Sequence, residues 1–171
     1  KTYFFLETTH QGKTNELIET YYNGQFEDGK CQSLELKKGR IGVKPIDNRY
    51  FVSTETSKVF IMHDNFKSSK LFPLNPLYLR KKKLRKNYIL ELVEIFKSNG
   101  QEYYNISFTP RKKVNDAFHA NVIVNINNNT LKKVVFRISN STQHPFVPIG
   151  GINLKSIDIS ITKNYEDINN E

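Results

Sequence analysis

The sequence has few of the residues that cross-link or anchor a chain. Its 171 residues include one cysteine, Cys31, which excludes an intrachain disulfide and a metal site built from several thiolates. No apolar run approaches the length of a transmembrane helix or of a signal-peptide core, and the longest candidate is Tyr3 to Leu6. Because the chain starts at Lys1 rather than Met, we expect a processed or excised piece of a longer protein.

The composition favours one ordered domain with an affinity for anions. Only 37% of the residues are hydrophobic, but twelve Phe and nine Tyr supply large buried areas, so the chain can build a core. The length predicts a single domain that covers residues 1–171. Lys and Arg total 26 against 17 Asp and Glu, a net charge of +9, which favours anionic partners without identifying one.

The clearest local pattern is a pair of consecutive β-hairpins from Tyr88 to Ser139. Asn99-Gly100 closes the first, and the triplet Asn127 to Asn129 turns the second between two runs rich in Val, Ile and Phe. Asn and Gly tolerate the positive φ of tight turns, and β-branched and aromatic residues suit a pleated surface. Later, Lys155 to Lys163 alternates apolar and polar residues, as a half-buried strand does.

The remaining patterns complete a mainly β, α+β chain, with a curved antiparallel sheet and one or two helices. Tyr3 to Thr8 and Glu16 to Tyr22 suit two strands, although a helix over Asn15 to Tyr22 is an alternative. Asn23-Gly24 predicts a turn, and a helix can start at Pro76 and run to Leu84. The side chains expected to face the interior are Val122, Val124, Ile126, Val134, Phe136, Ile138, Ile157, Ile159 and Ile161.

The motifs that carry chemistry give weak signals. Gly24 to Cys31 has most of the spacing of a phosphate-binding loop, but Cys31 replaces the required hydroxyl and the sequel is strand-like, which favours a strand connection. The histidines are far apart and show no metal-binding spacing. Cys31 is more typical of a small strand residue than of a nucleophile. We therefore predict no catalytic residues, metal or cofactor, although dispersed groups could still assemble in space.

A basic run supplies the one candidate site. Six of the seven residues from Arg80 to Lys86 are cationic, and three more follow at Arg111 to Lys113. If the two runs share one surface, they can bind phosphate, sulfate or carboxylate groups; the alternative is an ordinary solvated surface. No aromatic residues alternate with the cations, so nucleic acid is not expected. The predicted anion-binding residues are Arg80, Lys81, Lys82, Lys83, Arg85, Lys86, Arg111, Lys112 and Lys113.

Several stretches together resemble a known bacterial family. TYFFLETT, NELIETYYNGQF, LELKKGRIGV, NPLYLRKKKLRKNYILELVEIF and YYNISFTPRKK, with FHANVIVNI downstream, resemble the region that follows a carboxypeptidase-regulatory-like domain in Bacteroidetes-type envelope and outer-membrane proteins. Here His119-Ala120 stands where that family usually has Gly. These motifs are structural, so the resemblance carries over no catalytic residue.

The resemblance implies a periplasmic or cell-surface location and neighbouring domains in the same protein. The strand pattern also looks like the open half-barrel of lipoprotein carriers such as LolA, which is an analogy of fold alone. We expect a non-enzymatic module for binding or assembly, whose partner is a lipid or an anionic envelope component. One alternative is a lipid or lipoprotein carrier with an apolar cavity, and another is an enzyme that acts on an acidic envelope polymer.

Overall fold

The computed structural model describes residues 2–10, 13–27, 30–43, 54–62, 64, 66–112, 114–146 and 156–165. Its contacts divide the chain into two compact units, Lys1–Lys67 with Pro145–Leu154, and Ser68–His144 with Lys155–Glu171. The single domain remains a prediction. Each unit contains one antiparallel sheet, which confirms the mainly β, α+β class. The half-barrel form of the sheet also remains a prediction.

The first unit contains the strands β1 (Thr2–His10), β2 (Lys13–Glu27) and β3 (Lys30–Val43), in that order across the sheet, and the helix α1 (Thr54–Ile61). Alternation along β2 buries one face, which includes Ile18 and Tyr22. The Tyr22 hydroxyl lies 2.6 Å from Ser57 Oγ on α1, inside the unit. The strand interpretation of this segment is therefore confirmed, and the alternative helix is wrong.

The turn predicted at Asn23-Gly24 is wrong, because both residues lie inside β2. A Cβ on Gly24 would lie 2.7 Å from a ring carbon of Phe26 and 3.2 Å from Leu34 Cδ1. The position is therefore crowded by side chains of β2 and β3, which favours the residue without one. The register between the two strands also shifts between Tyr21 and Tyr22.

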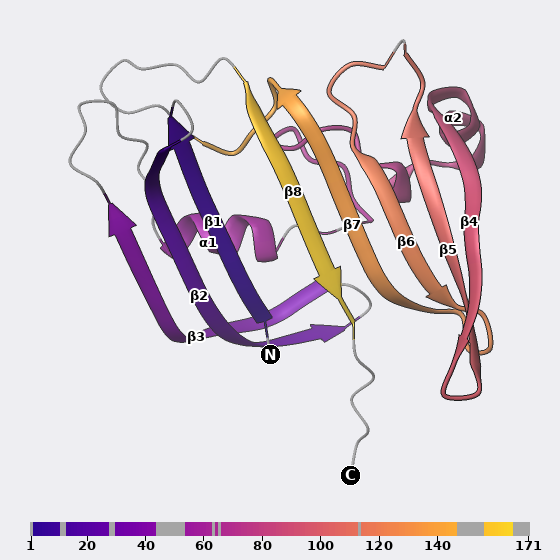
Figure 1. Cartoon of the computed structure of the whole chain (residues 1–171), viewed down its shortest axis with the longest axis horizontal. Helices are drawn as coiled ribbons and strands as arrows, with labels where there is room; N and C mark the ends of the chain where they lie inside the picture. The colour runs from indigo at the N-terminus through magenta and orange to yellow at the C-terminus, as the bar shows by residue number, and fades with distance from the viewer. Residues whose placement is uncertain are drawn as a thin grey trace. The chain divides into compact units, whose positions relative to one another are not determined.

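The second unit contains a five-stranded antiparallel sheet in which each strand lies beside the next in sequence (Figure 1). The predicted hairpins are confirmed: Asn99 and Gly100 have φ values of 50° and 73°, and Asn129 has 57°. These left-handed conformations are the ones that Asn and Gly tolerate best. The strands are β4 (Tyr88–Ser98), β5 (Gln101–Pro110), β6 (His119–Asn125), β7 (Thr130–Ser141) and β8 (Ile157–Asn164).

One face of this sheet carries the core. The predicted interior residues that are buried are Val122, Val134, Phe136, Ile159 and Ile161. Val124, Ile138 and Ile157 are half-buried. Ile126 lies in the turn after β6 rather than on a strand, because Asn125 ends the strand by accepting a hydrogen bond on its Oδ1 from the Asn127 N–H at 2.9 Å. Ile126 is half-buried in that turn, as Val124 is on the strand.

The segment before β4 covers part of that face. The expected continuous helix from Pro76 to Leu84 is wrong, because Leu79 and Arg80 are extended and separate η1 (Pro76–Tyr78) from α2 (Lys81–Asn87). Pro76 does begin the first of them, as predicted. The buried Tyr88 ring lies under this segment and its hydroxyl donates to the Leu74 carbonyl oxygen at 2.9 Å. Tyr88 thereby fixes α2 at the start of β4.

Candidate anion-binding surface

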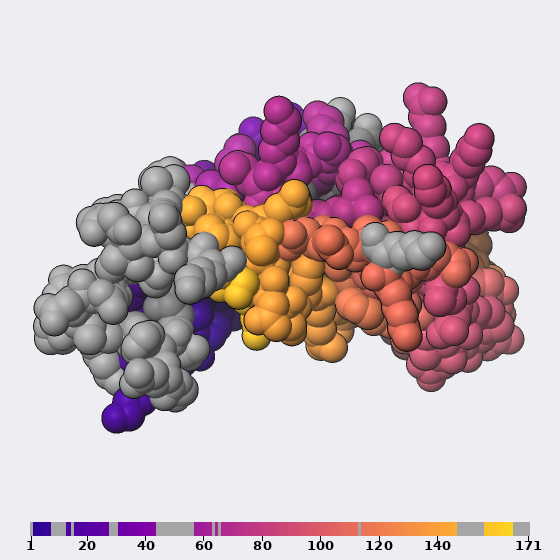
Figure 2. Space-filling view, turned by 90° about the horizontal axis from the view of Figure 1, so that it is seen from above, coloured from indigo at the N-terminus to yellow at the C-terminus, as the bar shows by residue number. Residues whose placement is uncertain are grey.

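The helix α2 carries the first basic run. Its cationic side chains and that of Arg80 are exposed, whereas Leu84 is half-buried. The helix starts after the extended Arg80, which provides no side-chain cap, and ends where Tyr88 becomes extended. No acidic residue lies in its first turn, where negative charge would be favourable. In the space-filling view, side chains of this part of the chain project outward from the surface (Figure 2).

The second basic run lies beside the end of this helix. Tyr88, which follows α2, pairs with Pro110 at the end of β5, so Arg111, the residue after β5, reaches back along the helix. The Arg111 N–H donates to the Asn87 carbonyl oxygen at 2.8 Å, and Arg111 Nε lies 3.4 Å from the Arg85 carbonyl oxygen. A guanidinium at a helix C-terminus is electrostatically favourable. The antiparallel pairing of β4 with β5 therefore joins two runs that are separate in sequence.

We name the combined group the cationic surface. Within the part of the chain that the structure describes, none of its side chains lies within ion-pair distance of a carboxylate. Other exposed lysines do have such partners, as Lys37 does with Glu35 at 2.7 Å. Lys113, the ninth predicted residue, lies outside the described residues. The cationic surface consists of Arg80, Lys81, Lys82, Lys83, Arg85, Lys86, Arg111 and Lys112.

A carboxylate anchors the loop that leaves the cationic surface. Asp116, with φ 46°, accepts hydrogen bonds on its carboxylate from Ser141 Oγ at 2.9 Å and from the Thr142 N–H at 2.7 Å. Burial raises the pKa of Asp116, but the hydrogen bonds from Thr142 and its neighbours outweigh burial and leave the pKa lowered. The Asp116 carbonyl oxygen also accepts from the Leu74 N–H at 2.7 Å. Asp116 thus ties this loop both to β7 and to the segment before α2.

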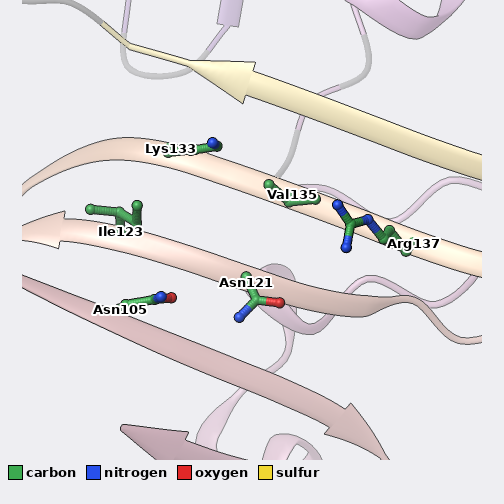
Figure 3. Close-up of a pocket in the computed structure, with 6 residues that line it drawn as sticks. All are labelled: Asn105, Asn121, Ile123, Lys133, Val135 and Arg137. Carbon is green, nitrogen blue, oxygen red and sulfur yellow. The ribbon is translucent and has the colours of Figure 1, made fainter. Parts of the chain in front are cut away.

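A shallow hollow of about 170 Å³ lies on the opposite face of the five-stranded sheet (Figure 3). Lys133, Val135 and Arg137 come from β7, and they share this face because they are two residues apart. Their neighbours Val134 and Phe136 point into the core. The residues that line the hollow are Asn105, Asn121, Ile123, Lys133, Val135 and Arg137.

The hollow combines two cations with two amides over an aliphatic floor. Asn105 Oδ1 is buried there and has no hydrogen-bond partner among the residues that the structure describes. None of the residues that line the hollow is among the site residues predicted from the sequence. A period-two count along β5, β6 and β7 would have found them, because each lies at a position of its strand that faces away from the core. The hollow is open and shallow and contains two cations. The cationic surface contains eight, so it is the stronger candidate for an anion-binding site.

The weaker motifs lie on ordinary strands. Gly24 and Cys31 lie on the neighbouring strands β2 and β3, which confirms the strand connection in place of a phosphate-binding loop. Cys31 Sγ donates to the Ser33 carbonyl oxygen at 3.4 Å. His119 is exposed on β6, and His144 is half-buried after β7. Among the described residues, no three His, Cys, Asp or Glu side chains form a group that could hold a metal ion.

Comparisons with protein-family models, with curated proteins and with solved structures found nothing that matches this chain. In the described part of the chain, no helix has the length and apolar character needed to span a membrane.

Proposed function

We propose that this chain is a non-enzymatic binding module and that the cationic surface holds a polyanion. The observation that supports this proposal is the group of eight exposed cations, drawn from two separate segments, with no carboxylate partner among the described residues. An ordinary solvated surface has charges of both signs interspersed. A surface that carries only positive charge attracts an anionic partner, and its affinity for that partner rises with the partner's charge density.

The chemistry of the side chains indicates how the partner is held. Lys and Arg reach outward on flexible stems and provide several N–H donors each, which suit the oxygens of phosphate, sulfate or carboxylate groups. Such contacts give affinity that depends steeply on salt and discriminate weakly between polymers. We therefore assign the surface a role in attachment to a polyanion.

We further propose a periplasmic or cell-surface location, in a larger bacterial envelope protein. The support is the resemblance of the strand motifs, LELKKGRIGV and YYNISFTPRKK among them, to the region after a carboxypeptidase-regulatory-like domain. In that setting the polyanion is an acidic polysaccharide or an anionic lipid headgroup layer.

Binding of labelled dextran sulfate tests the proposal, with the variant Lys81→Glu, Lys82→Glu and Lys83→Glu. We expect its affinity to fall by about a hundredfold or more, since each cation near an anionic surface contributes about 1 kcal/mol. The matched control is Lys37→Glu, Lys38→Glu and Lys67→Glu, which makes the same change in net charge on side chains that are also exposed. The control should bind almost as well as the unmodified protein.

Two outcomes would overturn the proposal. One is an unmodified protein that does not bind dextran sulfate at low salt. The other is an equal loss of affinity in the two triple variants, which would mean that net charge alone attracts the polymer.

A further inference from the structure

The strand β4 exposes more aliphatic surface than a strand usually does. It lies at the edge of the five-stranded sheet, and among the described residues β5 is the one strand with which it pairs. Tyr88 is its one buried side chain. Contiguous exposed apolar side chains on a soluble surface indicate a contact with a partner or a lipid phase. The exposed fractions are 41% for Ile89, 43% for Leu90, 51% for Leu92, 56% for Val93 and 52% for Ile95.

Three of these side chains continue the face on which α2 is fixed. Leu90, Leu92 and Ile95 pair with Phe108, Ile106 and Tyr104, in that order. Phe108 is buried in the core, so alternation places all three aliphatic side chains on the core face of the sheet, as it does Tyr88. The covering segment reaches only the start of β4, where α2 lies in Figure 1. An apolar strip thus begins where the cationic surface ends.

The strand is poorly suited to adding a strand from another chain. The register shifts between Leu92 and Glu94, so Val93 forms a bulge in the middle of β4. Bulges and charged side chains on an edge strand oppose pairing between edges, and β4 carries Glu91, Glu94 and Lys97 as well. A second copy of this chain is therefore not the partner that fits this strand.

A soluble polyanion would satisfy the cations and leave the aliphatic side chains in water. An anionic bilayer satisfies both, because its headgroups attract Lys and Arg while aliphatic side chains enter the boundary with the acyl chains. We infer that the partner of the cationic surface is an anionic lipid bilayer and that the exposed aliphatic side chains of β4 enter its interface, namely Leu90, Leu92 and Ile95 on the core face and Val93 at the bulge between them. This inference rests on the proposed function and specifies its ligand.

Cosedimentation with lipid vesicles tests the inference. The variant Leu92→Ser, Val93→Ser and Ile95→Ser should lose about tenfold or more of its affinity for phosphatidylglycerol and phosphatidylcholine vesicles, because burial of aliphatic groups is lost. Its affinity for dextran sulfate should not change. A matched control is Ile41→Ser, Val43→Ser and Met62→Ser, which replaces side chains of similar exposure in the other unit and should bind vesicles normally.

A fluorescent variant keeps the test independent of the triple substitution. The chain has no Trp, so Val93→Trp gives a single probe on the bulge. Its emission should shift to shorter wavelength with phosphatidylglycerol vesicles and be quenched by brominated lipid. An Ile41→Trp control should show neither effect.

Each other outcome has a defined meaning. Normal vesicle binding by the serine variant, or an unshifted Val93→Trp spectrum in the presence of bound vesicles, would overturn the inference and leave the polyanion proposal standing. Dimers that the serine variant abolishes would assign β4 to a second copy instead. A lipid retained in native mass spectra would indicate a carrier with an enclosed ligand. Failure of the unmodified protein to bind either dextran sulfate or vesicles would overturn the proposed function as well.

Discussion

Charge is treated in opposite ways in two regions of this protein, around Glu19 on β2 and on the cationic surface. Glu19 is 9% exposed, and its carboxylate accepts hydrogen bonds from the Tyr3 hydroxyl at 3.0 Å and the Tyr21 hydroxyl at 3.1 Å. It also pairs with Arg40. Burial raises the pKa of Glu19, but these three donors outweigh burial and leave the pKa lowered.

The cationic surface has no such arrangement. Its members are exposed and lack a carboxylate partner within the described residues. The buried charge is thus surrounded by donors and a counter-charge, whereas the exposed cations are not. Mutual repulsion among adjacent cations does not stabilise the fold. This clustering is the basis of the proposed binding of a polyanion.

The largest expected effect on stability concerns Asp116, a second carboxylate that is held by donors. Asp116→Ala should lower the free energy of unfolding by about 2 kcal/mol, because several hydrogen bonds to a charged group are lost and Ala tolerates a positive φ poorly. Asp116→Asn should cost less, since an amide oxygen can still accept from Thr142. Urea denaturation measures both changes, and equal losses would contradict the role given to the hydrogen bonds.

A pH dependence should follow from the same carboxylate. The pKa of Asp116 is lowered in the folded protein, so its stabilisation is complete above the unfolded-state pKa of about 4 and is lost as the pH falls through the folded-state value. The free energy of unfolding should therefore decline below about pH 4. Urea denaturation over this range should show a smaller decline for Asp116→Asn. An identical decline would assign the acid sensitivity to other carboxylates.

Replacement of Glu19 should alter the titration of its tyrosine neighbours. The hydrogen bond to Glu19 raises the pKa of Tyr21, and burial followed by the Glu19 hydrogen bond raises that of Tyr3. Glu19→Gln should lower both values toward that of a free phenol, as measured by tyrosinate absorbance against pH. Glu91→Gln, on an exposed carboxylate of β4, should leave the profile unchanged. If the titration profile of Glu19→Gln coincides with that of the unmodified protein, the hydrogen bonds from Tyr3 and Tyr21 to Glu19 do not set the pKa values of these tyrosines.

The smallest effect on stability should come from the cationic surface. The variant Lys81→Glu, Lys82→Glu and Lys83→Glu should unfold within about 0.5 kcal/mol of the unmodified protein, because exposed substitutions away from structural contacts change stability little. Thermal and urea denaturation would detect a larger loss. Such a loss would show that these lysines stabilise α2, and the contrast with Glu19 and Asp116 would then fail.

The sequence was sufficient where local patterns and tertiary structure agree. Asn99-Gly100 and the alternation after Lys155 predicted the hairpin and the last strand, because turn chemistry and burial favour the same structure there. The turn predicted at Asn23-Gly24 was wrong. A glycine can be required within a strand, where a side chain such as that of Phe26 leaves no space for a Cβ, as well as in a turn. Periodicity also could not reveal the break at Leu79, where the backbone becomes extended between η1 and α2.

The sequence predicted which cationic residues form the candidate site, but not that the two basic runs lie side by side. The basic residues from Arg80 and from Arg111 stand out in sequence, yet only the pairing of Tyr88 with Pro110 places them together. The aliphatic strip on β4 was not predictable in the same way, since the apolar residues of a hairpin strand do not by themselves show whether another element covers them. Their exposure follows from the short reach of the covering segment and from the edge position of β4.

The salt dependence of dextran sulfate binding tests the central claim most directly. If the cationic surface binds the polyanion, the logarithm of the binding constant should fall linearly with the logarithm of salt concentration, with a slope of about −3 or steeper. The variant Lys81→Glu, Lys82→Glu and Lys83→Glu should make the slope shallower by about 2, since each lost contact removes roughly 0.7. A slope near zero in the unmodified protein, or an unchanged slope in this variant, would contradict the claim.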